Sequence, residues 1–148
     1  MEIPIKVYRE NSTVEFPVYK TEDAACADVY VHRLDIHNDT VVVHTGLHFA
    51  LPTGWEMQIR PRSGFTKYRY AVLNSPGTLD ADYRGELLIK YTRIDGGYAD
   101  DFPYNIGDRC CQINIHPVPK MKFEEVDSLE ALGETERGQG GFNSTGKN

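Results

Sequence analysis

Short strand-like segments recur along the whole chain, and helix-like periodicity is almost absent. In residues 3–7 and 55–59, apolar side chains alternate with polar ones, which is the period of a half-buried β-strand. Turn-forming residues separate such segments, as in residues 52–54, 75–77, 95–97 and 106–108. This spacing predicts an all-β fold, which is a sandwich, a barrel or a jelly roll.

Further strands are predicted in residues 14–19, 27–32, 40–44, 47–51, 71–73, 86–94 and 109–118, and the one helical signal, residues 128–132, is very short. A length of 148 residues suits a single core. We assign residues 1–132 to one β-rich domain. From residue 133 the chain is rich in glycine and poor in apolar side chains, so residues 133–148 are predicted to form a flexible C-terminal arm.

Composition excludes several classes of protein. Apolar runs reach only four residues, so no membrane span is expected. The net charge of −6 argues against binding to long nucleic acids. Cys26, Cys110 and Cys111 fit neither a disulfide framework nor a zinc site, and the first residues do not form a secretory signal. The expected location is the cytoplasm.

Two apparent motifs are set aside. His44 and His48 are four residues apart, but they lie in a strand-like region, so we interpret them as surface or packing histidines. Residues 141–147 have the spacing of a phosphate-binding loop. Such a loop follows a strand, opens a helix and ends in Ser or Thr after the lysine, whereas here Asn148 follows.

Three turns carry groups suited to phosphate or water, although each one alone also fits a plain structural turn. Residues 61–64 offer a guanidinium and a hydroxyl group where a strand ends. Residues 107–109, with Gln112, repeat this arrangement. Residues 74–86 hold acids that could accept a proton from water, and the arm adds an aromatic ring, an arginine and hydroxyl groups.

The order of these segments carries more information than any one of them. Pro61-Arg62-Ser63-Gly64, residues 77–85, Gly107-Asp108-Arg109 with Gln112, and residues 137–146 follow a degenerate first motif in residues 25–29. In this order the chain resembles the trimeric dUTP pyrophosphatases from about residue 24 to residue 146. The resemblance implies a jelly-roll homotrimer with active sites at the subunit interfaces, and an arm that closes over a site built by the other chains.

The resemblance also implies the reaction, which is hydrolysis of dUTP to dUMP and pyrophosphate by attack of water on the α-phosphorus. Mg²⁺ would be bound mainly to the triphosphate. Such an enzyme keeps uracil out of DNA and supplies dUMP for dTMP synthesis. Carried over by position, Asp80 would deprotonate the water and Tyr83 would lie under the deoxyribose and reject UTP. Asn74 and the hairpin backbone at Gly77 and Thr78 would bind the uracil edge.

The same resemblance assigns the remaining site residues. Those expected to hold the phosphates are Arg62, Ser63, Gly64 and Gln112, with Arg137, Ser144 and Thr145 from the arm. Phe142 would stack on the uracil ring, and Asp28 would place the metal through water. Asp108 and Arg109 look structural. The chain departs from the family pattern at Cys26, Thr66 and Asn143, and the loop 95–101 matches nothing in it.

Three alternatives stay open. A dCTP deaminase of the same fold has a catalytic glutamate ten residues after its motif-three acid, and Lys90 occupies that position here. A dUTP-sensing regulatory protein, bound to a protein partner, would need the same residues. A structural jelly roll without chemistry would give no reason for Asp80, Tyr83 and the arm to occur together.

Overall fold

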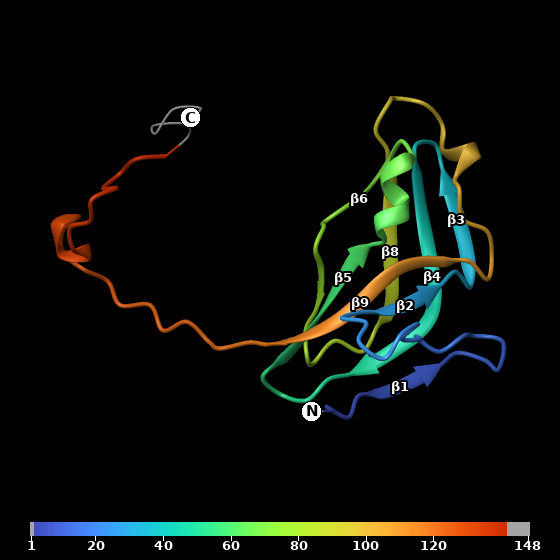
Figure 1. Ribbon diagram of the computed structural model, residues 1–148, viewed down its shortest axis with the longest axis horizontal. Coiled ribbons are helices and arrows are strands. Elements are labelled where there is room, and N and C mark those ends of the chain that lie inside the picture. Colours follow the sequence, from blue (N-terminus) through green and yellow to red (C-terminus); the bar gives the residue numbers. More distant parts are fainter. Residues whose placement is uncertain (1, 142–148) are drawn as a thin grey trace.

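The computed structural model describes residues 2–141, and its strands form two antiparallel sheets (Figure 1). The first sheet has the order β1 (Lys6–Arg9), β4 (Thr40–Ala50), β8 (Glu86–Arg93) and β6 (Tyr70–Val72), with β3 (Arg33–His37) paired to β4. The second has the order β2 (Ala27–Tyr30), β9 (Arg109–Pro117), β5 (Trp55–Pro61) and β7 (Gly77–Leu79). The predicted all-β class is confirmed.

The core lies between the sheets because inward-facing residues alternate along their strands. Val41 and Val43 of β4 and Ile89 of β8 are almost fully buried. Each such side chain contributes about 1.5–3 kcal/mol relative to an exposed one. The buried hydroxyl of Tyr91 in β8 donates a hydrogen bond to the carbonyl of Cys110 in β9 (2.7 Å), which joins the two sheets.

An aromatic cluster fixes the segment that follows β5. Phe65, in the 3₁₀ helix η1 (Ser63–Lys67), is buried with its ring centroid 4.8 Å from that of Tyr91 and 5.4 Å from that of Tyr104. Aromatic rings at such separations attract each other beyond the effect of their buried area. The residues just before Phe65, which carry the second motif, are therefore held at the end of β5.

The strand predictions hold in part. Residues 40–44 and 47–51 form one strand, β4, whose register shifts between His44 and His48 around Gly46, at φ +66°. The strand predicted in residues 14–19 is wrong, because only an isolated bridge joins Val18 to Asp28. β3 and β7 were not predicted, since β3 is rich in charged side chains and β7 lies within a turn motif.

The chain beyond β9 extends away from the sheets (Figure 1). Residues 119–139 are exposed, and they include the short 3₁₀ helix η3 (Glu130–Leu132). A further 3₁₀ helix, η2 (Ala99–Asp101), lies between β8 and β9. Residues 133–141 of the predicted arm form the distal part of this described extension, and Phe142, Asn143, Ser144 and Thr145 lie outside the described residues. Within residues 2–141, no helix is long and apolar enough to span a membrane.

Candidate active site

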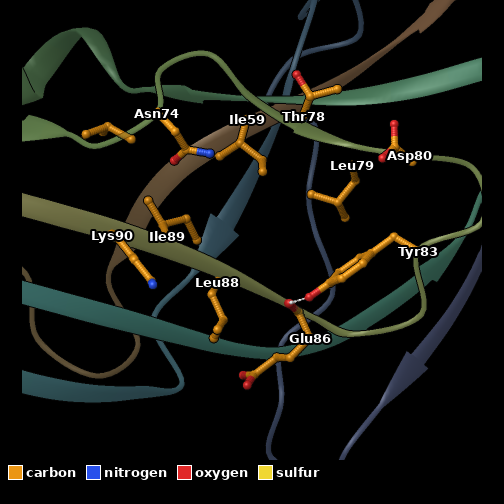
Figure 2. A pocket seen from close by; sticks show the side chains of 12 residues that line it. Ile59, Asn74, Thr78, Leu79, Asp80, Tyr83, Glu86, Leu88, Ile89 and Lys90 are labelled. Atoms are coloured by element: carbon orange, nitrogen blue, oxygen red, sulfur yellow. Dashed lines mark hydrogen bonds between the residues drawn. The ribbon is translucent and has the colours of Figure 1, made fainter.

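A cavity of about 180 Å³ lies where the chain crosses from β6 in one sheet to β7 in the other and returns to β8 (Figure 2). Five residues of the predicted site share its wall: Asn74, Gly77, Thr78, Asp80 and Tyr83. The sequence reasoning missed the other lining residues: Ile59, Val72, Leu79, Glu86, Leu88, Ile89 and Lys90. Strand periodicity predicts which of these side chains share a face of their own strand. The crossing of the chain between the two sheets brings them to one cavity, and periodicity does not show that crossing.

Asn74 occupies one end of the cavity, and Asp80 and Tyr83 lie at the other end (Figure 2). Asn74 has φ +47°, a left-handed conformation that asparagine tolerates better than most residues. Gly77 pairs with Ile59, and a Cβ atom on Gly77 would lie 3.0 Å from the Ile59 side chain. Glycine therefore allows β7 to approach β5 closely beside the cavity.

The ring of Tyr83 is supported by the backbone beneath it. Its hydroxyl donates a hydrogen bond to the carbonyl of Glu86 (3.2 Å; Figure 2). A Cβ atom on Gly85 would lie 2.2 Å from the Tyr83 hydroxyl oxygen and 2.4 Å from Cζ. No side chain fits between the ring and the turn, so Gly85 sets the position of this wall.

The carboxylates in the same turn are exposed. Arg84 donates to the carbonyls of Ala81 (2.7 Å) and Tyr83 (2.8 Å), and so it braces the backbone. Within residues 2–141 neither Asp80 nor Asp82 has a salt-bridge partner within 4.0 Å. The Asp80 carboxylate is thus free to accept a proton from a bound water.

A second group of predicted residues surrounds Asp28, which is 5% exposed in β2. Arg62 Nε donates to Asp28 Oδ1 (3.1 Å), Arg109 Nη1 donates to Oδ2 (2.9 Å), and Gln112 Nε2 lies 3.4 Å from Oδ1. Two guanidinium groups share one carboxylate, which leaves a local excess of positive charge. Such an arrangement suits a phosphate.

The residues next to this group lie in the turns beside it. Ser63 and Gly64 are exposed in η1, directly after Arg62. Asp108 accepts a hydrogen bond from the Asn105 backbone N–H (2.7 Å) and so closes its own turn, as expected for a structural residue. Arg109 likewise has a structural contact, its ion pair with Asp28.

The carboxylate of Asp28 is compatible with a metal ion that is bound mainly by the substrate. Both oxygens of Asp28 face guanidinium groups, so only contact through water leaves these ion pairs intact. Within residues 2–141 no three His, Cys, Asp or Glu residues gather to hold a metal. Mg²⁺ in nucleotide sites is commonly bound by one or two carboxylates together with substrate phosphates, so this set of donors is compatible with it.

The two groups do not form one site within a single chain. The cavity is lined by none of Asp28, Arg62, Ser63 and Gln112. Arg137 lies on the extended segment, where its Nε donates to the Gly140 carbonyl (2.7 Å). A single chain therefore presents a pocket with an acid and an aromatic wall in one place and a cationic cluster in another.

Asp28→Asn is expected to lower the free energy of unfolding by about 3 kcal/mol, because it leaves two guanidinium groups without their buried counter-charge. Urea denaturation checks this. Asp100→Asn is the control, since Asp100 is exposed in η2, and its effect should stay within about 0.5 kcal/mol. Equal effects of the two substitutions would contradict a structural role for the Asp28 carboxylate.

A small cavity with an aromatic wall, an exposed carboxylate beside it and a separate guanidinium cluster define an enzyme-like site for a small phosphate ester. A family model described as dUTPase matches residues 12–146. This chain belongs to the dUTPase family.

Relatives and solved structures agree with this assignment. Deoxyuridine 5'-triphosphate nucleotidohydrolase of Desulfotalea psychrophila is 43% identical over 93% of this chain and 91% of its own length. The enzyme of the same name from Fusobacterium nucleatum is 36% identical over 99% of both chains. A dUTPase of Staphylococcus bacteriophage 80alpha, solved with dUpNHpp, shares the fold at a TM-score of 0.78 and 19% identity, over 97% of this chain and 99% of that chain.

Proposed function

We propose that this protein is a dUTP diphosphatase that hydrolyses dUTP to dUMP and pyrophosphate, keeps uracil out of DNA and supplies dUMP for dTMP synthesis. The observation that carries the proposal is the cavity that joins Asn74, Asp80 and Tyr83 in a chain of the dUTPase family. Pyrophosphate release from dUTP, compared with other nucleotides, tests it.

In this proposal the uracil ring enters the cavity at the Asn74 end. The Asn74 amide and the backbone at Gly77 and Thr78 bind its polar edge. A wrong base would leave buried polar groups without hydrogen-bond partners, and this lowers the binding free energy far more than a missing apolar contact does. The site would obtain its selectivity from this difference. Asp80, at the opposite end, orients a water toward the α-phosphorus and takes its proton.

Tyr83 is assigned to exclude ribonucleotides, because a ring packed under the sugar leaves no room for a 2′-hydroxyl group. Gly85→Ala tests this assignment, since its Cβ would displace the Tyr83 ring. The ratio of kcat/KM for dUTP to that for UTP is expected to fall about tenfold.

Tyr83→Phe is the matched control. It keeps the ring and removes only the hydrogen bond from the hydroxyl group to the Glu86 carbonyl. Selectivity for dUTP should therefore stay close to that of the unchanged protein. If Gly85→Ala discriminated against UTP as strongly as Tyr83→Phe does, the ring would not be the excluding group.

The phosphates are assigned to the cluster around Asp28. Arg62, Ser63, Gly64 and Gln112 would hold them, and Arg137 and the arm residues Ser144 and Thr145 would add donors while Phe142 stacks on the base. Mg²⁺ bound to the triphosphate would neutralise its charge, with Asp28 acting on it through water. A dUTPase of phage phi11 of S. aureus, similar in fold at a TM-score of 0.68, coordinates a structural Mg(II) ion.

The same proposal includes a homotrimer. The cavity and the cationic cluster are separate within a chain. One chain would therefore supply the nucleoside pocket, and another would supply the side chains that bind the phosphates. The extended segment carries Met121 and Phe123, which are 79% and 85% exposed. Two exposed apolar side chains so close in sequence are suited to contact another surface, which neighbouring subunits would supply.

The alternatives gain no support. Lys90, which lines the cavity, stands where the dCTP deaminases have their catalytic glutamate. A dUTP-sensing role with a regulatory protein partner stays a hypothesis beside hydrolysis. We place the reaction in the cytoplasm, where the three free cysteines would stay reduced.

A further inference from the structure

Two histidines of β4 contact the segment that supports Tyr83: His48 through its backbone and His44 through the Glu86 side chain. Nδ1 of His48 lies 2.9 Å from the carbonyl oxygen of Arg84, and Nε2 of His48 lies 3.1 Å from Glu10 Oε1. Nδ1 of His44 lies 2.9 Å from Glu86 Oε2, and Nε2 lies 2.9 Å from Asp35 Oδ2.

The irregularity of β4 completes this attachment. At Gly46, between the two histidines, the backbone N–H donates to Glu86 Oε1 (2.8 Å). The Glu86 side chain is therefore bound to β4 at two points, and the Arg84 backbone at a third. Because Arg84 and Glu86 flank Gly85, these contacts fix the segment on which the Tyr83 ring rests.

The partners of His48 require it to be charged. A backbone carbonyl and an ionised carboxylate only accept hydrogen bonds, so each ring nitrogen that faces one must carry a proton. Neutral imidazole has one N–H group and imidazolium has two. His48 makes both contacts only in the protonated form, and loss of that proton leaves a nitrogen lone pair against an oxygen.

We infer that His44 and His48 are positioning residues for Tyr83, and that His48 makes the affinity for the nucleotide fall as the pH rises. This inference rests on the proposed function, in which Tyr83 supports the deoxyribose. Neither histidine lines the cavity, so both would act through the segment 83–86.

The charged groups around His48 favour its protonated form. Glu10 and the ring of Tyr8 face it from the β1 side, and Glu86 and the backbone of Arg84 face it from the β8 side. The Arg84 carbonyl raises the pKa of His48, partial burial opposes this, and Glu10 adds to the increase. The stabilising contacts are thus complete below the usual pKa of about 6.5 and disappear as the pH rises through the higher value in the folded protein.

The pH dependence is assigned to His48, whose pKa is raised and whose two facing groups both accept hydrogen bonds, whereas His44 also faces a hydrogen-bond donor. A guanidinium nitrogen of Arg33 lies 2.9 Å from each ring nitrogen of His44, so a cation faces that ring together with Asp35 and Glu86. His44 contributes by holding the Glu86 carboxylate in place.

Steady-state kinetics of the full-length protein with dUTP and saturating Mg²⁺, between about pH 6.5 and pH 9, test the inference. For the unchanged protein, KM should rise about fivefold over this range while kcat changes less than about twofold. His48→Ala should show the raised KM at every pH. His48→Asn keeps an N–H donor near the position of Nδ1 and cannot titrate, so its KM should stay low and vary least with pH.

Substrate phosphate titration affects all variants equally, so each KM is compared with that of His48→Asn at the same pH. His44→Asn, which keeps a donor toward Glu86, should retain a lower KM than His44→Ala. The inference is overturned if the KM profile of the unchanged protein matches that of His48→Asn, or if His48→Ala alters thermal stability without altering KM.

Failure of the proposed function would look different. Absence of dUTP hydrolysis at every pH would contradict that function and not the role of the histidines. Calorimetric titration with dUMP over the same pH range then decides the inference. Binding that weakens at high pH in the unchanged protein, but not in His48→Asn, supports it, and identical profiles contradict it.

Discussion

Asp80→Asn is expected to lower kcat for dUTP by about a thousandfold, the range over which a positioned general base accelerates a reaction. The amide has nearly the same shape as the carboxylate but does not take a proton from water. Because Asp80 is exposed and has no ion-pair partner among residues 2–141, the fold and dUTP binding should be retained. Pyrophosphate release and calorimetric binding of dUTP measure the two effects.

Asp82→Asn is the matched control, since Asp82 is a second exposed carboxylate in the same turn and does not line the cavity. Its kcat should stay within about threefold of the unchanged value. A large loss in both variants would indicate that the charge of the whole turn matters. A large loss in Asp82→Asn alone would move the catalytic role away from Asp80.

Removal of residues 137–148 is expected to lower kcat/KM for dUTP by about a hundredfold or more, because in the proposed function the arm brings charged and hydroxyl donors to the phosphates and excludes water. Arg137 lies on a segment that extends away from its own sheets, so the loss should leave the fold of the chain intact. The proposed trimer should be retained, since the apolar part of the extension, with Met121 and Phe123, remains.

A chain that ends at Gly146 keeps every assigned arm residue and serves as the control. Light scattering gives the mass of each assembly, and pyrophosphate release gives the turnover. Equal turnover of the chain lacking residues 137–148 and the control would contradict closure of the arm over the site. Loss of the assembly in the shorter chain would instead give the arm a structural role.

The sequence predicted the fold class because strand periodicity and turn residues are local signals. Alternation in residues 55–59 marked β5 correctly. The strand expected in residues 14–19 failed because sheet pairing is a tertiary property, and in this stretch only Val18 finds a partner. β3 was missed because its charged side chains look like a loop until its pairing with β4 is known.

The sequence named candidate site residues, but it gave no indication of the contacts among them. The resemblance placed Asp28, Arg62 and Gln112 in a phosphate and metal site by position. Their shared contacts depend on the register that sets Asp28 opposite Gln112, and Gln112 opposite Arg60 near the end of β5. No spacing along the chain shows such a register.

His44 and His48 illustrate the same limit. Their spacing gave no reason to expect more than surface or packing roles. The structure places both ring nitrogens of each histidine against oxygen atoms, on either side of the register shift in β4. A role through neighbouring backbone has no signature in residue type alone.

The most direct test of the proposed function mixes the purified protein and Mg²⁺ with dUTP, dCTP, dTTP or UTP in four separate reactions. The release of pyrophosphate and of ammonia is measured in each. Pyrophosphate from dUTP alone is the predicted result, and it would support the assignments of Asp80, Tyr83 and the uracil edge together. Ammonia from dCTP, or no product from any of the four nucleotides, would contradict the account.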